Sequence, residues 1–351
     1  MRVTIADVAR AAGVSKTTVS RVLNTRGEVD RSTAARVRDV IDRLGYVPSS
    51  GAVGLARGHS RTIGMLVPSL TWPWMGEVVQ GVVDTVEAAE FGLLLFTCNR
   101  GAESVERFTG QVSAGAFDGL LVVEPEDTLD TLTALHRKGL PVVLIDDRGH
   151  HPEFPYVTAA NREGGAAAAR HLLSTGRHRP LVLAGPTRFG CVRDRVAGFR
   201  EVYAAHGRKP GPMAVAESDF TEADGREVVR RLLARGREFD AVFALNDLAA
   251  VGAMAAVHAA GLRVPEDVAV IGFDDIPAAR LTRPALTTVR QPMRLMGETA
   301  ARLLLARLTG GASPSAPVVL PTSVVVRESA PSRAEGPLPR GGLVDSRATE
   351  G

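Results

Sequence analysis

Apolar side chains near the amino end of the chain recur at helical spacing. The first segment is apolar at positions i, i+3, i+4 and i+7, which predicts one buried face of a short helix made by Ile5, Val8, Ala9 and Ala12. Gly13 follows where a left-handed turn is needed, because glycine alone adopts that conformation without a Cβ penalty. Ser15 is a good N-cap for a second helix, whose apolar face consists of Val19, Val22 and Leu23. The pattern predicts two short helices joined by a tight turn.

Two further segments complete the amino-terminal region. Residues 32–44 repeat the helical pattern with Gly45 as the stop. Residues 48–60 lack this helical pattern. Gly51 and Gly54 would each lower the stability of a free helix by roughly 1 kcal/mol. We therefore expect a three-helix headpiece over residues 1–47, followed by a hinge over 48–60 that is disordered unless a partner orders it.

From residue 61 to about residue 327, apolar runs of strand length alternate with helical stretches. The expected strands are 62–67, 93–97, 119–123, 142–145, 181–184, 241–245 and 268–273, and the first expected helix is 75–90. Such alternation predicts parallel sheets with right-handed crossovers, and its restart near residue 181 predicts two similar lobes with a cleft between them. The expected class is α/β: a helix-turn-helix headpiece, a two-lobed domain over 61–330 of parallel sheets flanked by helices, and a disordered tail over 331–351.

Positive charge is concentrated in the headpiece, and this indicates what the headpiece binds. The 351-residue chain has a formal net charge of +3, yet residues 1–60 hold ten basic and five acidic side chains, which leaves −2 for the other 291 residues. On the second helix, Lys16, Thr17 and Arg21 are predicted to face outward. A short, polar and basic helix surface suits entry into a DNA groove, where phosphates must be neutralised. The alternative, a merely solvated arginine-rich surface, does not explain why the turn and the charge coincide.

The rest of the composition favours a soluble, cytoplasmic protein without catalytic chemistry. Cys98 and Cys191 are too few for a disulfide framework, no apolar leader follows Met1, and no apolar stretch approaches the ~20 residues of a membrane span. The sequence has no nucleotide-binding glycine motif, P-loop or nucleophile elbow, and the pair His150-His151 lacks metal-ligand spacing. We therefore expect no enzyme activity, no cofactor and no metal site.

An ordered series of motifs resembles the LacI/GalR family of bacterial transcription regulators over residues 3–327. The motifs are Asp7-Val-Ala9, Ala12-Gly-Val-Ser15, Thr18-Val-Ser-Arg-Val-Leu-Asn24, Arg195-Val-Ala-Gly-Phe199, Asn246-Asp247, Val264-Pro-Glu-Asp267, Ile271-Gly-Phe-Asp-Asp275 and Leu286-Thr-Thr-Val-Arg-Gln291. The resemblance implies a homodimer whose two headpieces read a pseudo-palindromic operator in double-stranded DNA. It also implies that the two-lobed domain resembles periplasmic sugar-binding proteins and binds a small effector.

The resemblance assigns DNA-binding roles by position. Lys16, Thr17 and Arg21 match the positions that reach base edges in the major groove. Four residues match positions that contact phosphates and fix register: Thr4, Ser15, Ser20 and Asn24. For the hydroxyl residues helix capping is the simpler alternative, and for Ser15 both roles are compatible. Leu55 matches a hinge leucine that wedges between base pairs in the minor groove, although Ala52-Val53-Gly54 departs from the usual sequence before that leucine.

The same resemblance predicts an effector site with an unusual wall. Where the family commonly has Asn-Pro-Phe-Phe after the first strand, this chain has Trp72-Pro-Trp-Met75. An indole offers a flat apolar face to a sugar ring and an N–H donor to its hydroxyls; packing in the core is the alternative role for both tryptophans. Phe220 matches an aromatic position across the cleft. The polar positions are Asp146, Arg195, Asn246 and Asp274, with Gln291 at the rim and Cys191 near the same wall.

These residues predict a transcriptional repressor of carbohydrate-metabolism genes that is controlled by a sugar-like effector. For Asp247 and Asp275 we expect structural roles in capping or loop bonding. A second hypothesis is a regulator that needs no effector, or one that responds to a co-repressor, a phosphorylated metabolite or a protein partner. An enzyme or a transport-binding protein is the third hypothesis, and the missing motifs argue against it. Whether the effector induces or co-represses stays open.

Overall fold

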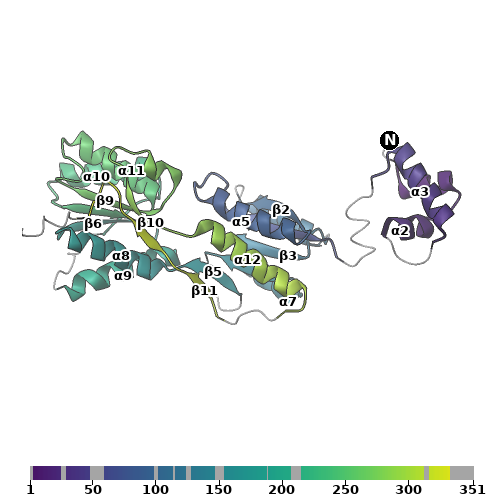
Figure 1. Ribbon diagram of the computed structural model, residues 1–351. Helices are drawn as coiled ribbons and strands as arrows, with labels where there is room; N and C mark the ends of the chain where they lie inside the picture. The colour runs from purple at the N-terminus through teal and green to yellow at the C-terminus, as the bar shows by residue number, and fades with distance from the viewer. Residues whose placement is uncertain are drawn as a thin grey trace, which may run out of the picture. The chain divides into compact units, whose positions relative to one another are not determined.

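The structure is a computed structural model that describes residues 3–24, 29–47, 59–98, 102–113, 115–123, 128–146, 154–187, 189–206, 215–311 and 316–332 (Figure 1). The chain divides into two compact units, one made of Met1–Thr62 and Gly110–Asp118, the other of Ile63–Thr109 and Gly119–Gly351. Leu55 with most of the expected hinge, the pair His150-His151 and nearly all of the expected tail lie outside the described residues.

Three helices form the headpiece: α1 (Ile5–Ala12), α2 (Lys16–Asn24) and α3 (Arg31–Leu44). Their shared core is small and apolar, and Val8, Val19 and Val37 are fully buried in it. Gly13 ends α1 in the left-handed conformation, with a φ of 65°. The three predicted helices are confirmed, and α3 begins one residue earlier than expected because Asp30 caps it by accepting a hydrogen bond from the Thr33 N–H.

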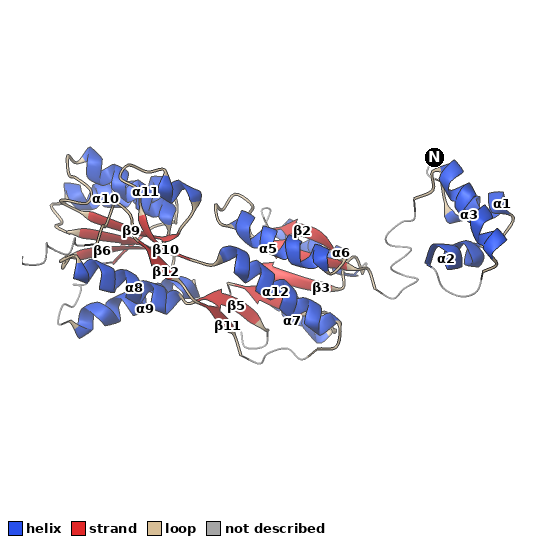
Figure 2. Ribbon diagram, viewed as in Figure 1, coloured by secondary structure: helices blue, strands red, loops and turns tan. Residues whose placement is uncertain are grey.

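The sheet of the first lobe has six strands in the spatial order β11-β5-β4-β3-β1-β2 (Figure 2). The strands are β1 (Thr62–Val67), β2 (Gly92–Thr97), β3 (Gly119–Val123), β4 (Val142–Ile145), β5 (Tyr156–Ala159) and β11 (Val318–Leu320). The helices between them are α5 (Met75–Ala88), α6 (Ala102–Ser113) and α7 (Leu129–Arg137), and α12 (Met293–Leu308) returns to this lobe from the second. Central strands β3 and β4 are buried along their whole length, as expected for parallel strands that are covered on both faces.

The sheet of the second lobe repeats this plan in the order β12-β10-β9-β8-β6-β7. Its strands are β6 (Pro180–Ala184), β7 (Val215–Glu217), β8 (Ala241–Ala244), β9 (Ala269–Asp274), β10 (Thr287–Arg290) and β12 (Ser323–Val325). Its helices are α8 (Asn161–Ser174), α9 (Gly190–Ala205), α10 (Glu222–Ala234), α11 (Asp247–Ala259) and the short 3-10 helix η2 (Pro277–Arg280). One detail differs from the expected parallel sheet, because the edge strand β12 runs antiparallel to β10.

The chain passes between the lobes at three places: from β5 to α8, from β10 to α12, and from β11 to β12. Hydrogen bonds join two of these crossovers, since the Ala160 N–H donates to the Leu320 carbonyl at 2.8 Å and the Thr322 hydroxyl donates to the Ala160 carbonyl at 3.4 Å. The two lobes are therefore joined by connections at 159–161, 290–293 and 320–323.

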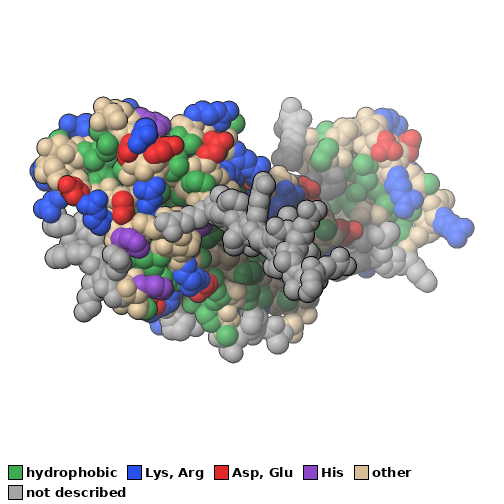
Figure 3. Space-filling view, turned by 60° about the vertical axis from the view of Figure 1, so that its left-hand side comes forward, with side chains coloured by type: hydrophobic (Ala, Val, Ile, Leu, Met, Phe, Trp, Pro, Cys, Tyr) green, Lys and Arg blue, Asp and Glu red, His purple; other side chains and the backbone are tan. Residues whose placement is uncertain are grey.

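Charges of both signs share the surface of the two-lobed unit. Basic and acidic side chains lie beside one another on the face seen in Figure 3. Many form exposed short-range ion pairs, such as Arg226 with Glu222 at 3.0 Å and Arg263 with Asp267 at 2.8 Å. Pairs of this kind add little to stability. None of the helices that the structure describes is long and apolar enough to span a membrane.

Candidate functional site

The predicted reading surface of the headpiece is the outer edge of α2. Lys16, Thr17 and Arg21 are all exposed there, while Val19 and Val22 on the opposite edge are buried. Ser20 is half-buried, and Asn24 belongs to α2, but its side chain lies outside the described residues. The edge therefore offers an ammonium, a hydroxyl and a guanidinium group to the solvent, as a groove-reading helix requires.

The two helix-start residues predicted to contact phosphates both act as caps. The Thr4 hydroxyl donates to the Asp7 carboxylate at 2.7 Å and the Thr4 N–H donates to the same oxygen at 3.0 Å. These bonds lower the pKa of Asp7. The Ser15 hydroxyl accepts from the Thr18 N–H at 3.1 Å. The Ser15 and Thr18 hydroxyls also lie 2.9 Å apart, and either can donate to the other. Thr4 would have to release Asp7 to donate its proton to a phosphate.

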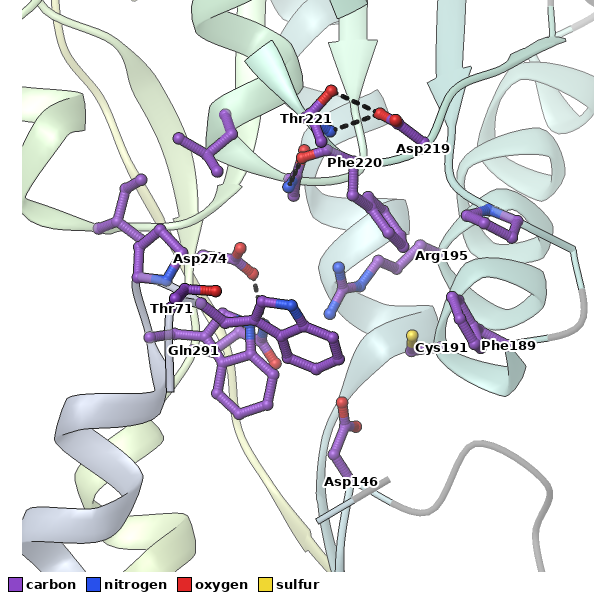
Figure 4. A pocket seen from close by; sticks show the side chains of 17 residues that line it. Thr71, Asp146, Phe189, Cys191, Arg195, Asp219, Phe220, Thr221, Asp274 and Gln291 are labelled. Atoms are coloured by element: carbon purple, nitrogen blue, oxygen red, sulfur yellow. Dashed lines mark hydrogen bonds between the residues drawn. The ribbon is translucent and has the colours of Figure 1, made fainter. Parts of the chain in front are cut away.

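A cavity of about 540 Å³ lies at the carboxyl ends of strands from both lobes (Figure 4). The first lobe contributes the loop Thr71–Trp74 after β1 and Asp146 after β4; the second contributes residues from α9, the β7–α10 loop, the start of α11, the end of β9 and the crossover after β10. All nine residues predicted for effector binding line this one cavity: Trp72, Trp74, Asp146, Cys191, Arg195, Phe220, Asn246, Asp274 and Gln291. The volume is in the range of small-molecule sites, roughly 300–1,000 Å³.

Two pairs of aromatic rings form the apolar part of the wall. In the first lobe the rings of Trp72 and Trp74 have centroids 5.7 Å apart at an angle of 41°. Both tryptophans are half-buried and also pack against the core of that lobe, so the packing role and the lining role coexist. In the second lobe Phe189 and Phe220 stack with centroids 6.2 Å apart.

The backbone conformation of Phe220 and a glycine beneath its ring fix the position of this side chain. Its φ is 70°, a conformation that L-residues rarely adopt and that occurs preferentially at functional sites. Its ring lies over Gly185, where an added Cβ would come within 2.0 Å of a ring carbon. The ring therefore occupies a position that requires glycine beneath it.

Arg195 is the buried cation of the pocket, with only 4% of its surface exposed. Its Nε donates to the Asn161 side-chain oxygen at 2.9 Å and its Nη1 donates to the Leu245 carbonyl at 2.6 Å. The guanidinium group lies 3.7 Å from the centroid of the Phe273 ring, a cation–π contact. From α9 it extends toward the centre of the pocket (Figure 4).

Two buried carboxylates accompany this cation. Asp146 accepts from the Thr158 hydroxyl at 3.3 Å, and Asp274 accepts from the Gln291 amide at 2.6 Å. Burial raises the pKa of Asp274 to about 7; Arg195 and the Gln291 hydrogen bond oppose the rise, and Asp146 adds to it. Both aspartates have positive φ, 55° and 120°, so strained backbone aims both carboxylates at the cavity.

Asn246 has a structural task besides lining the pocket. Its oxygen caps α11 by accepting from the Ala249 N–H at 3.0 Å, and its amide donates to the Phe220 carbonyl at 2.7 Å. One amide N–H is left for a ligand. Cys191 is buried in the α9 wall.

The structural roles expected for the two neighbouring aspartates are confirmed. Asp247 accepts from the Thr288 hydroxyl at 2.5 Å and from the Ile276 N–H at 2.9 Å, and burial raises its pKa. Asp275 accepts from Arg290 Nε at 2.7 Å and from the Arg327 guanidinium. These contacts fix the loop after β9, from which Asp274 enters the pocket.

Sequence reasoning missed eight residues that line the cavity: Thr71, Pro73, Pro186, Phe189, Asp219, Thr221, Leu248 and Ile276. Asp219 and Thr221 flank Phe220, so their position beside a predicted wall residue was an available signal. Nothing in the sequence connects Asn161 with Arg195, which lies 34 positions later. Among the residues that the structure describes, no group of His, Cys, Asp and Glu side chains could hold a metal ion.

The fold and the pocket define a class: a two-lobed ligand-binding protein with a helix-turn-helix headpiece. Residues 4–49 match the sequence model of bacterial regulatory proteins of the lacI family, and residues 169–330 match that of the periplasmic binding protein-like domain. The chain is 36% identical over 337 residues to the HTH-type transcriptional regulator CelR of Thermobifida fusca, covering 93% of this chain and 98% of the relative. It is 33% identical over 331 residues to the HTH-type transcriptional repressor PurR of Pasteurella multocida (strain Pm70), covering 94% and 99%.

Solved structures agree with this class. The transcriptional regulator CelR–cellobiose complex is 35% identical with a TM-score of 0.72, covering 93% of this chain and 100% of that one. The lac repressor dimer bound to operator and the anti-inducer ONPF is 28% identical with a TM-score of 0.83, covering 94% and 100%. The chain belongs to the LacI family of bacterial transcriptional regulators, and the family and fold expected from the sequence are confirmed.

Proposed function

We propose that the chain is a homodimeric repressor of carbohydrate-metabolism genes and that a neutral sugar bound between the lobes controls its affinity for a pseudo-palindromic operator. One observation carries the sugar-binding part: nine residues selected from the sequence line a single cavity that combines indole faces with a buried guanidinium group and carboxylates. Flat apolar faces suit the C–H side of a sugar ring, and planar donors and acceptors suit its hydroxyls.

The charge of the pocket favours a neutral ligand over a phosphorylated one. Among the described lining residues, three carboxylates belong to Asp146, Asp219 and Asp274 and one guanidinium belongs to Arg195. Even when Asp274, whose pKa is raised to about 7, is protonated, two acidic groups accompany one guanidinium group, so the cavity lacks the surplus of positive charge that binds a phosphate. The related CelR was solved with cellobiose, which supports a neutral sugar as the effector and argues against the phosphorylated metabolite.

In this proposal the headpiece reads DNA through the residues predicted from the sequence. Lys16, Thr17 and Arg21 contact base edges, and Leu55 is the minor-groove wedge. The phosphate contacts come from Thr4, Ser15, Ser20 and Asn24. The lac repressor dimer bound to operator supports a dimeric assembly. Residues 1–47 would be the headpiece, 48–60 the hinge, 61–330 the effector-binding and dimerisation domain and 331–351 the tail, in a protein that works in the cytoplasm.

The test begins with an operator selected from random duplexes by the full chain. Fluorescence anisotropy then measures operator affinity with cellobiose, maltose, glucose, glucose 6-phosphate or a purine base. We expect a neutral sugar to change the operator Kd at least about tenfold, which corresponds to about 1.4 kcal/mol of coupling; the sign of the change distinguishes an inducer from a co-repressor. A response to glucose 6-phosphate or the purine base alone would contradict the proposal.

A further inference from the structure

Two of the charged groups in the pocket are joined by a chain of buried hydrogen bonds. Asp146 comes from the end of β4 in the first lobe and Arg195 from α9 in the second. The Thr158 hydroxyl donates to the Asp146 carboxylate at 3.3 Å, and the Asn161 amide donates to the Thr158 hydroxyl at 3.4 Å. The Asn161 oxygen accepts from Arg195 Nε at 2.9 Å. No member of this chain is more than 9% exposed.

The two intermediate residues stand on either side of a lobe crossover. Thr158 lies in β5 of the first lobe, and Asn161 is the first residue of α8 in the second lobe. Only Ala159 and Ala160 separate them, and Ala160 is hydrogen-bonded to the third crossover through the Leu320 carbonyl. A rotation of one lobe against the other would turn about these peptides, so the side chains of Thr158 and Asn161 lie where such a rotation begins.

Close packing of two helices brings Arg195 to Asn161. Gly165 lies one turn after Asn161 on α8, and an added Cβ there would come within 2.1 Å of the Arg195 carbonyl oxygen. The backbones of α8 and α9 therefore touch at Arg195, and the start of α8 comes within reach of its guanidinium group. Because Nε is bonded to Asn161 and Nη1 to the Leu245 carbonyl, the plane of the guanidinium group is fixed.

We propose that Thr158 and Asn161 form a positioning bridge, which holds Asp146 of one lobe and Arg195 of the other in the arrangement that binds the effector. The inference rests on the proposed sugar-binding function. Neither residue lines the cavity; each acts through the charged group that it holds. A sugar that bonds to both Asp146 and Arg195 is thereby connected to the β5–α8 crossover, and its binding resists or drives lobe rotation through this bridge.

Two substitutions at one position separate the bridge from simple packing. Thr158→Val keeps the branched shape but removes the hydroxyl, whereas Thr158→Ser keeps the hydroxyl and removes a methyl group. Packing in a buried strand predicts that valine is tolerated and serine is destabilising. The bridge predicts the reverse order for ligand binding: the cellobiose Kd rises roughly tenfold in Thr158→Val and stays within about twofold of wild type in Thr158→Ser.

Isothermal titration with cellobiose measures these constants on the full chain, and thermal unfolding is recorded in parallel. Asn161→Leu, which removes both bonds of the amide, should raise the Kd further. In an Arg195→Met background Asn161→Leu should lose most of its effect on the Kd, and the part that remains should equal the contribution of its bond to Thr158. The control is Thr287→Val in β10, where a buried threonine bonds to the Arg327 and Ala330 carbonyls outside the pocket; its Tm should fall while its cellobiose Kd stays unchanged.

The outcomes separate the bridge from the proposed function. If wild type binds cellobiose and Thr158→Val binds it equally well, the bridge is wrong and the sugar-binding proposal stands. If affinity falls only in proportion to Tm across all variants, the residues are structural and the bridge is again wrong. If wild type binds none of cellobiose, maltose and glucose, the proposed function fails and the bridge fails with it.

Discussion

The outer edge of α2 and the pocket between the lobes differ in how far their polar groups are exposed to solvent. Lys16, Thr17 and Arg21 are exposed on one nine-residue helix and lie within six positions of one another. Arg195 and Asp274 are buried, come from different elements and are already bonded to protein partners. The three side chains on α2 keep their contact with solvent, whereas the charged groups of the pocket have exchanged most of theirs for contacts with protein.

This difference decides which forces act at each site. If Lys16 and Arg21 contact DNA as proposed, their solvated charges gain affinity by releasing counterions, and operator binding should weaken steeply as salt rises. Buried, fixed groups act at a low local dielectric, where each bond to a ligand is strong and salt matters little. A single buried substitution should therefore change its ligand affinity more than a single exposed one.

Arg195→Met should give the largest effect. It removes the planar donor of the pocket and leaves the carboxylates of Asp146 and Asp274 without their buried cation, so we expect the cellobiose Kd to rise roughly 100-fold, about 3 kcal/mol. Isothermal titration measures the Kd. Operator affinity without sugar, measured by anisotropy, should stay within about threefold of wild type.

Arg195→Lys is the matched control for charge. Lysine keeps the positive charge but lacks the bidentate fork that bonds to Asn161 and the Leu245 carbonyl. Its affinity should be intermediate. If Arg195→Met binds cellobiose as wild type does, the buried guanidinium group has no part in effector binding.

Arg21→Ala tests the other side of the comparison and should give a smaller change. Loss of one base-reading arginine should weaken operator binding by about 2 kcal/mol, roughly 30-fold, and relax specificity at one base position. Anisotropy with the selected operator and its single-base variants measures both. Arg43→Ala on α3 removes the same charge from an exposed pair with Asp39, so it should weaken all sequences equally and by much less. Equal effects of the two substitutions would mean that Arg21 contacts only phosphates.

The elements of the fold were predictable where the pattern was long or local. The three headpiece helices follow from helical periodicity, and the seven expected strands follow from apolar runs of strand length. The strands that sequence reasoning missed are β5, β7, β10, β11 and β12, each of three or four residues. Segments that short carry almost no periodic signal, and four of them, all but β7, lie beside the lobe crossovers, where long-range pairing rather than local sequence determines the strand.

The pocket was predictable by resemblance, and its supporting contacts were not. Trp72 and Trp74 stand out in one loop, Arg195 and Asp274 lie in the ordered motif series, and Asp146 directly follows the expected strand 142–145. Asn161 and Gly185 have no such signal: their importance depends on Arg195 and Phe220, which are 34 and 35 positions away in the chain. Only the packing of α8 on α9, and of the β7–α10 loop on the end of β6, brings these pairs together.

Per pH unit, the smallest expected effect is the pH dependence of stability that the buried carboxyl group of Asp274 should cause. In the folded protein the pKa of Asp274 is raised to about 7, well above its usual value of 3.8, mainly by burial. The folded state therefore prefers protonated Asp274. Its contribution to stability is complete below about pH 4 and is lost as pH rises toward 7, on the order of 1 kcal/mol per pH unit at most. Chemical denaturation of wild type and Asp274→Asn between pH 4 and pH 8 measures the difference.

Asp267 supplies the opposite sign on the surface. Its hydrogen bonds from Arg263 lower its pKa to about 2, so its contribution is present at neutral pH and is lost only as pH falls below 4. Asp267→Asn should therefore leave the pH dependence between 5 and 8 unchanged, whereas Asp274→Asn should flatten it. Cellobiose sharpens the contrast: if the sugar bonds to ionised Asp274, its affinity rises from pH 5 to pH 8 in wild type and not in Asp274→Asn. If the stability of wild type depends on pH as that of Asp274→Asn does across the whole range, Asp274 stays ionised throughout. The buried carboxylate would then behave like a solvent-exposed group, as the charged groups on α2 do.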